Sequence, residues 1–151
     1  MADQLSGIVI RRAEAGELAV IARLMRLWSN LAWAFMVRHT PEEDMGWIRR
    51  SAELGVIWTT LEGDRIVGFC SARRGWIDLF HVAPERHGQG IGRALLARAL
   101  KGRTRVRLWT FQRNERTRRF YALQGFHEVR LTDGRDNEER EPDVLLEWRR
   151  V

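Results

Sequence analysis

The sequence predicts an α/β fold (α+β by stricter naming), in which helices cover both faces of one mixed sheet. Two observations support this: apolar strand-like runs alternate with helical stretches, and the element order is β-α-α-β-β-β-α-β-α-β-β. Consecutive strands pair antiparallel, whereas a strand-helix-strand crossover joins parallel neighbours. With 151 residues and a hydrophobic fraction of 44%, the chain has enough apolar surface for one domain over residues 1–151.

The chain opens with a predicted strand and an amphipathic helix. Residues 7–13 form a short apolar run. Leu18, Ile21, Met25 and Trp28 then recur at spacings of three and four, which places them on one face of a helix.

The next stretch, 29–39, fits either an extension of this helix or a loop over a cleft. A second helix is predicted after it. Thr40 suits an N-cap, Pro41 suits the first turn, and the two glutamates that follow are favoured near the positive end of the helix dipole. We expect this helix to end at about Glu53.

Three antiparallel strands are predicted next, and the first two flank the turn Glu62-Gly63-Asp64, in which Gly63 can take a positive φ. Helix and strand then alternate to the end of the chain, with Gly102 and Gly125 as helix stops. The expected segments are strands 55–61, 65–73 and 76–82, helix 90–101, strand 105–111, helix 114–124, strand 126–131, a polar loop 132–143 and a closing strand 144–150.

Composition narrows the function classes. No run approaches the roughly 20 apolar residues of a membrane helix, and no secretion signal is recognisable, so we predict a cytoplasmic protein without a membrane partner. The net charge of +6 comes almost wholly from arginine, since Lys101 is the only lysine. This fits a phosphate-bearing partner or a mere bias toward arginine. The sole cysteine, Cys70, lies in an apolar run and is predicted to be a buried structural thiol.

The most informative segment, PERHGQGIGR from Pro84 to Arg93, lies between a predicted strand and a predicted helix. Gly88, Gly90 and Gly92 occupy alternate positions in it. Such glycines leave successive backbone N–H groups unobstructed, and the helix behind them adds the positive end of its dipole. A tight bend alone rarely needs three glycines. We therefore predict a cradle for phosphate or pyrophosphate.

Two nucleotide-binding patterns fail here on local detail. A Walker A loop needs Gly-Lys followed by Ser or Thr, whereas the chain has Gly92-Arg93-Ala94. A dinucleotide fingerprint needs its third glycine at position 93 and an acid about 20 residues further on. Residues 108–112 read Leu-Trp-Thr-Phe-Gln, with no acid among them.

The segment instead resembles the acetyl-CoA motif of the GNAT superfamily of N-acetyltransferases: Gln or Arg, two residues, Gly, one residue, then Gly or Ala. The matching positions are His87, Gly90 and Gly92, of which His87 departs from the motif. The resemblance implies that backbone N–H groups of this turn bind the pyrophosphate of coenzyme A, with Arg86 or Arg93 as charge partner. The cofactor-binding residues implied here are His87, Gly88, Gln89, Gly90, Ile91, Gly92 and Arg93.

A second motif follows about 20 residues later and strengthens the resemblance. The family pattern is Asn, two residues, Ala, two residues, Phe-Tyr, then Gly-Phe, and Thr117 replaces the Ala here. The resemblance implies that Asn114 binds the pantetheine arm while it caps a helix. The matching residues are Asn114, Thr117, Phe120, Tyr121, Gly125 and Phe126.

Tyr121, the only tyrosine, is the predicted general acid. A thiolate leaves when acetyl-CoA gives up its acetyl group, and a phenol with a pKa near 10 is protonated at neutral pH. The resemblance also implies that Phe80, His81 and Val82 pair through their backbone with pantetheine. An N–H of this strand would then polarise the thioester carbonyl.

Direct transfer to an amine, without a covalent enzyme intermediate, is what the resemblance implies. Several residues compete for the role of general base. Asp78 and His81 lie on the predicted strand before the glycine turn, and Glu138 or Glu139 can reach in from the late acidic loop. Relay through water, with no single essential base, also remains open.

The acceptor is predicted to be an amine of a small molecule or a peptide, with its pocket in the region of the first two helices. Aromatic residues there either line this pocket or pack in the core, and the acidic stretch 136–143 either attracts a cation or is a solvated loop. No metal site is predicted, and a monomer and a homodimer both remain open. The aromatic residues are Trp28, Trp33, Phe35 and Trp47.

Two other functions remain open. A nucleic-acid-binding module would use the arginines of one predicted helix, although these arginines can equally face the 3′-phosphoadenosine end of coenzyme A. A GNAT fold can also bind acyl-CoA without turnover. The arginines concerned are Arg113, Arg116, Arg118 and Arg119.

Overall fold

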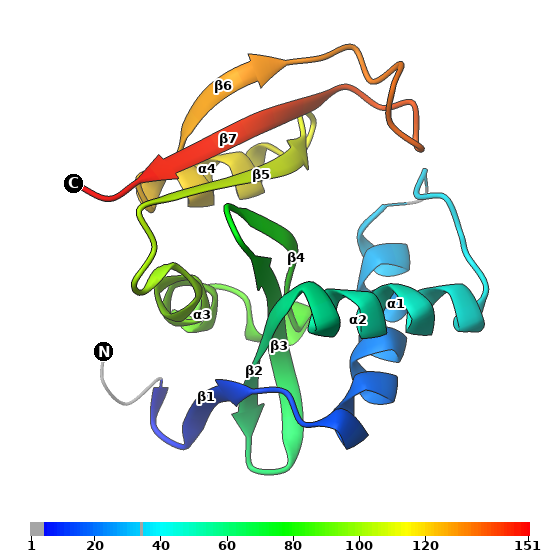
Figure 1. Ribbon diagram of the computed structural model, residues 1–151, viewed down its shortest axis with the longest axis vertical. Helices are drawn as coiled ribbons and strands as arrows, with labels where there is room; N and C mark the ends of the chain where they lie inside the picture. Colours follow the sequence, from blue (N-terminus) through cyan, green and yellow to red (C-terminus); the bar gives the residue numbers. More distant parts are fainter. Residues whose placement is uncertain (1–4, 34) are drawn as a thin grey trace.

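The computed structural model describes residues 5–33 and 35–151, which form one seven-stranded mixed sheet with helices on both faces (Figure 1). The strand order is β1-β2-β3-β4-β5-β7-β6, and β4 and β5 are the parallel pair. This confirms the fold class predicted from the sequence. The strands are β1 (Ile8–Arg12), β2 (Gly55–Glu62), β3 (Arg65–Arg73), β4 (Trp76–Val82), β5 (Arg105–Phe111), β6 (His127–Leu131) and β7 (Asp143–Arg149).

Two apolar cores lie on the two faces of the sheet. Ile21, Met25 and Ile48, from the first two helices, pack with β2 and β3 on one face. Leu95 and Tyr121, from the last two helices, pack with the inward side chains of β5 and β7 on the other. The helices are α1 (Leu18–Ala32), α2 (Pro41–Leu54), α3 (Ile91–Leu100) and α4 (Glu115–Leu123), with short 3₁₀ turns at Ala15–Glu17 and Pro84–Arg86.

Local chemistry explains where α2 begins. The Thr40 side chain accepts from the Glu43 N–H at 3.1 Å, and the Glu43 carboxylate accepts from the Thr40 N–H at 3.0 Å, which completes a capping box. For the stretch 29–39, the sequence left open an extension of the first helix or a loop, and each is correct for one part. Helix α1 continues to Ala32, and the described residues between it and α2 belong to no helix or strand. The other predicted elements agree within one or two residues.

Strands β4 and β5 separate almost as soon as they meet. In the described chain only Trp76 and Arg107 are paired in this parallel ladder, whereas β5 and β7 share a continuous register from Arg105 to Phe111. The rest of β4, from Ile77 to Val82, therefore has no strand on its β5 side. Ligands of open α/β sheets bind where neighbouring strands diverge at their carboxyl ends.

The outer face of the β5–β7–β6 ribbon is held by a buried carboxylate. The Glu147 side chain, 3% exposed, accepts from Arg107 and Arg149 at 2.6 Å and from Arg105 at 2.9 Å. These hydrogen bonds, that of Arg149 foremost, lower the Glu147 pKa to about 2. Part of the arginine surplus therefore serves the fold. No helix among the described residues is long and apolar enough to cross a membrane.

Candidate active site

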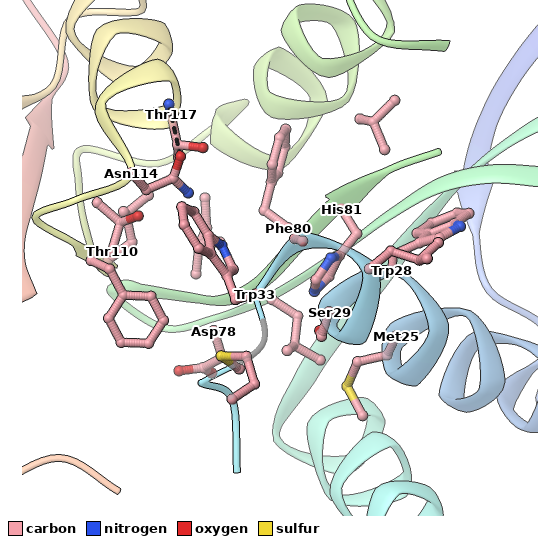
Figure 2. A pocket seen from close by; sticks show the side chains of 18 of the residues that line it. Met25, Trp28, Ser29, Trp33, Asp78, Phe80, His81, Thr110, Asn114 and Thr117 are labelled. Carbon is pink, nitrogen blue, oxygen red and sulfur yellow. Dashed lines mark hydrogen bonds between the residues drawn. The ribbon is translucent and has the colours of Figure 1, made fainter. Parts of the chain in front are cut away.

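A cavity of about 1500 Å³ lies at the separation of β4 and β5. Its walls come from segments far apart in the sequence: α1, α2 and the stretch between them on one side, and the glycine turn and α4 on the other. Figure 2 shows side chains from α1, β4, β5 and the start of α4 gathered around the same space. Most residues predicted to bind cofactor or to shape the acceptor pocket therefore line one cavity. The exceptions are Gln89, Phe35 and Ile91, whose side chain is buried in the core.

The glycine turn has the backbone geometry of an anion cradle. Gly88 and Gly90 take φ values of 77° and 86°, which side-chain-bearing residues rarely adopt, and Gly90 is the N-cap of α3. Among the described residues, the N–H groups of positions 88–93 donate to no protein acceptor. Gly92 differs, because a Cβ there would lie 3.5 Å from the Phe120 ring. This is an ordinary van der Waals distance, so there is room for a Cβ at position 92.

His87 acts through its side chain in this structure. The ring Nε2 donates to the Val82 carbonyl at 2.8 Å, and the backbone N–H donates to the Pro84 carbonyl at 3.3 Å. The ring therefore fixes the turn against the end of β4. This argues against an anion-binding role for the His87 N–H, and the free amides begin at Gly88.

The arginines near the turn differ in availability. Arg86 forms an ion pair with Glu62 and donates to the Gln89 side chain at 2.8 Å, so its charge is already neutralised. Arg93 and Arg116 line the cavity, are exposed, and have no ion-pair partner among the described residues. Of the two charge partners predicted from the sequence, Arg93 is the available one, and Arg116 joins it from α4.

The β4 edge offers unpaired backbone groups to the cavity. The Ala83 N–H donates to the Val67 carbonyl of β3 at 2.8 Å. Because backbone groups point alternately to the two sides of a strand, those of Phe80 and Val82 face the gap and those of His81 face β3. Phe80 therefore presents a free N–H and C=O, whereas the Val82 carbonyl accepts from His87. Of the three residues predicted to bind through the backbone, His81 is turned away.

Asn114 begins α4 at the opposite side of the gap. Its Oδ1 accepts from the Thr117 N–H at 3.3 Å, the bond drawn as a dashed line in Figure 2. The predicted N-cap is therefore confirmed. The cap uses only the side-chain oxygen, so the amide group, which lines the cavity, keeps its NH₂ donors for a ligand.

Tyr121 lies inside an aromatic cluster and still contributes to the cavity wall. It is 4% exposed, and its ring centroid lies 5.2 Å from that of Phe126, 5.3 Å from that of Phe120 and 6.0 Å from that of Phe80. Burial raises the pKa of the phenol above its usual value near 10. Tyr121 is therefore fully protonated at neutral pH, as a proton donor must be.

The His81 imidazole projects toward α1. It lies among aromatic rings, with centroid distances of 5.2 Å to Phe69 and 6.5 Å to Trp28. Burial lowers the pKa of His81 to about 4. The imidazole is therefore neutral at pH 7 and keeps a free nitrogen lone pair, but it is a weak base.

The three carboxylates proposed as bases differ in their surroundings. Asp78 accepts from the Arg73 guanidinium at 2.6 Å and 3.0 Å. Glu138 contacts the Nε2 of His39 at 3.0 Å. Glu139 also lines the cavity and, within the part of the chain described, forms no ion pair. Asp78 is therefore bound by Arg73, and Glu138 is bound by His39. The sequence alone did not indicate either partner.

The aromatic residues of the α1–α2 region divide between core and cavity. Trp28 is 8% exposed and stacks on Phe69 at 5.8 Å, yet it reaches the cavity wall. Trp47 is half exposed at the cavity rim. Trp33 projects into the cavity between Asn114 and His81 (Figure 2).

Comparisons with known proteins show the family to which the chain belongs. The model of the acetyltransferase (GNAT) domain matches residues 53–128, half of the chain, from the end of α2 through α4 into β6. The chain therefore belongs to the GNAT acetyltransferase family. It is an N-acetyltransferase, and the cofactor of this family is acetyl-CoA.

Relatives and solved structures cover nearly the whole chain. The peptidyl-lysine N-acetyltransferase YiaC of Escherichia coli is 28% identical over 145 residues, covering 93% of this chain and 96% of its own. Ard1 from Thermoplasma volcanium superposes with a TM-score of 0.78 at 18% identity, over 96% and 99% of the two chains. YncA from Salmonella typhimurium, solved with acetyl-CoA, gives 0.75 at 17% identity, over 94% and 93%. At these identities the two structures show a shared fold.

The residues present suit coenzyme A. Free amides at a helix N-terminus match a diphosphate, and unpaired arginines beside them match its additional phosphate. The free β4 edge matches an amide-bearing pantetheine arm, which can pair with it as an added strand does. Two walls can now be distinguished. We call the cavity-lining residues of segments 78–93, 108–111, 114–117 and 120–124 the cofactor wall, and those of segments 25–33, 36–50 and 138–139 the acceptor wall, after the roles expected of them.

Proposed function

We propose that this protein transfers the acetyl group of acetyl-CoA directly to a primary amine, and that a lysine side chain of a peptide is the first acceptor to test. The observation that carries the proposal is the placement of a buried phenol, Tyr121, in the same cavity as the free amides after Gly88. A cradle alone explains binding, whereas a protonated acid beside the binding site explains turnover. The similarity to YiaC supports the choice of lysine as acceptor.

The chemistry divides between the walls. Acetyl-CoA, when bound, supplies an activated acetyl thioester. The unpaired Phe80 N–H stabilises the negative charge that develops on the carbonyl oxygen when an amine attacks. Tyr121 donates its proton to the departing sulfur, because a buried phenol is neutral and can hand over a proton where the thiolate forms. The proton that the attacking nitrogen loses as the amide forms returns through water to the phenol. The acceptor amine enters from the side of α1 and α2.

The amine must arrive without its extra proton. We infer that water within the cavity carries this proton outward, with Glu139 as its first protein acceptor. Glu139 lines the cavity and has no ion-pair partner among the described residues, whereas Asp78 is held by Arg73 and the imidazole of His81 is a weak base. A relay of this kind needs no single strong base at the reacting nitrogen.

The first experiment separates binding from turnover. At about 100 times its dissociation constant, acetyl-CoA should stabilise the protein by about 2.7 kcal/mol, which corresponds to a rise in Tm of about 5–10 °C. Release of free CoA is then measured with a lysine peptide blocked at its N-terminus, a peptide with a free α-amine, and a polyamine. CoA release with at least one amine supports the proposal. A shift in Tm without release from any acceptor would instead support a fold that binds acyl-CoA without turnover.

Two of the four arginines that motivated the nucleic-acid alternative are occupied by ion pairs. Arg113 is paired with Glu141 and Arg118 with Glu128, so half of the arginines at α4 are already neutralised. Arg116 lines the cavity instead of forming part of a flat basic face. A salt-dependent mobility shift with duplex DNA checks this, and we expect no complex at about 150 mM salt.

A further inference from the structure

The stretch between α1 and α2 lies over the cavity with little backbone support. We name residues 33 and 35–40 the strap. Its N-terminal end is fixed by the Trp33 N–H, which donates to the Ser29 carbonyl at 3.1 Å, and its C-terminal end by the capping box of α2. Between these ends, the one backbone bond among the described residues is a long one of 3.5 Å from the Met36 N–H to the Trp33 carbonyl. Side-chain contacts must therefore hold the strap in place.

The central contact is made by Phe35. Its ring meets the Phe111 ring edge-on at 5.1 Å, and the Arg113 guanidinium lies 4.6 Å from its centroid. Trp33 in turn packs on Phe35 at 5.4 Å. Phe35 thus connects the indole that projects into the cavity to the end of β5 and the start of α4, on the opposite side of the gap.

Arg113 is itself held in a fixed orientation. Its Nε and one terminal nitrogen donate to the two oxygens of Glu141 at 2.9 Å and 2.8 Å. The Glu141 side chain is 14% exposed. The backbone N–H of Glu141 donates to the side-chain oxygen of Asn137 at 3.2 Å, and the Asn137 side-chain nitrogen donates to the Glu141 carbonyl at 2.7 Å. A bidentate pair fixes the plane of the guanidinium, which is the plane presented to Phe35.

We propose that Arg113 is a positioning residue for the acceptor: through Phe35 it holds Trp33 in the acceptor wall, and so it sets the shape of the space into which the amine enters. The inference rests on the proposed function. The ion pair of Arg113 and Glu141 is mostly solvent-facing on the arginine side, so it adds little to the stability of the fold. Its effect is on the strap.

The kinetic test uses the lysine peptide blocked at its N-terminus as acceptor. Arg113→Met keeps the length of the side chain but removes the planar charge. It should raise the KM for the peptide about tenfold and leave the KM for acetyl-CoA within about twofold, because the substitution abolishes a cation–π interaction and a bidentate pair that both lie outside the cofactor cradle. Arg113→Lys keeps the charge without the planar fork and should resemble Arg113→Met.

Arg118→Met is the matched control. Arg118 also bonds a carboxylate, that of Glu128, and lies in the first turn of α4, where it donates in addition to the Gln112 carbonyl at 2.9 Å. No hydrogen bond, ion pair or ring contact joins it to the described residues of the strap. Its peptide KM should remain unchanged. Phe35→Leu should reproduce the effect of Arg113→Met, and the double variant should be no worse than either single variant, because both break the same chain of contacts.

Amide hydrogen exchange of Trp33 and Met36, whose N–H groups donate to backbone carbonyls, provides a readout that needs no acceptor. In Arg113→Met these two amides should exchange at least about tenfold faster than in the wild type, and in Arg118→Met at the wild-type rate. Unchanged exchange, or equal decreases in peptide and acetyl-CoA affinity, would overturn the inference. If the wild type shows neither a shift in Tm with acetyl-CoA nor CoA release, the proposed function itself fails, and the exchange experiment still decides the role of Arg113 in the strap.

Discussion

The cofactor wall and the acceptor wall are built in different ways. The first uses backbone groups: free amides after Gly88, an unpaired strand edge at Phe80, and a helix start at Asn114. The second uses side chains from α1, the strap, α2 and the β6–β7 loop, held together by contacts such as Phe35 on Arg113. A backbone wall depends on short local motifs, whereas a side-chain wall depends on long-range packing. The first can therefore stay the same while the second changes with the acceptor.

The largest expected effect falls on Tyr121, where the two walls meet. Tyr121→Phe removes only the hydroxyl from a well-packed ring, so the fold and the KM for acetyl-CoA should change little. Loss of the proton donor should lower kcat about 100-fold or more. Steady-state kinetics over a range of acetyl-CoA concentrations checks this. If kcat stays at the wild-type value, the proton for the leaving thiolate comes from elsewhere.

The next effect tests whether the cofactor wall acts through its backbone. Gly90→Val places a β-branched residue at a φ of 86° and disturbs the free amides, so the affinity for acetyl-CoA should fall about 10- to 100-fold. Titration calorimetry measures this. The control is Gly63→Val, at a φ of 60° in the β2–β3 turn, where a Cβ also meets open space. Both variants carry similar strain, but only Gly90→Val should bind acetyl-CoA more weakly.

A third prediction concerns His81, which connects β4 to the acceptor wall. Its pKa is lowered to about 4, whereas in the unfolded chain it is near 6.5, so the unfolded state takes up a proton first as the pH falls. The wild type should therefore lose about 2–3 kcal/mol between pH 6.5 and 4 that His81→Gln does not lose. Urea unfolding at several pH values tests this. Parallel curves for the two proteins would show that the imidazole is solvated.

The smallest effect comes from the second tie of the strap. The Nε2 of His39 contacts Glu138 at 3.0 Å and its Nδ1 lies 3.6 Å from Glu43, and these carboxylates, Glu138 foremost, raise the His39 pKa. The stabilisation is present below about pH 6.5 and disappears as the pH rises through the raised pKa. His39→Gln should lower Tm by about 1–3 °C at about pH 5.5, because an exposed pair contributes little, and should leave Tm unchanged at about pH 9. An equal decrease at both pH values would contradict this account.

The sequence predicted the fold and the cofactor wall because both depend on local patterns. Alternating strands, a capping box and glycines at positive φ each act over a few residues, so their positions can be read directly. The partners of Asp78 and His87 could not be read in this way. Arg73 lies across the β3–β4 turn from Asp78, and the His87 ring reaches back five residues to the Val82 carbonyl.

The acceptor wall was predictable only as a region. The aromatic residues before and within α2 indicated either a pocket or a core, and the structure assigns Trp28 to both and Trp33 to the cavity. The contact of Phe35 with Arg113 joins residues 78 positions apart in the chain. No periodicity or spacing carries such information, because it arises from the way the sheet and helices bring these segments together. The same holds for two residues of the late acidic stretch, since Glu141 pairs with Arg113 and Glu138 with His39, both far away in the sequence.

The single residue pair between β4 and β5, Trp76 with Arg107, affects the rigidity of the sheet. Two half-sheets that share so little backbone ladder are held in register mainly by the side chains of the core beneath them. A molecule that pairs with the free edge of β4 and also contacts the start of α4 connects the two halves of the sheet where β4 and β5 diverge. We therefore expect the sheet to be stiffer across β4 and β5 when the site is occupied than when it is empty.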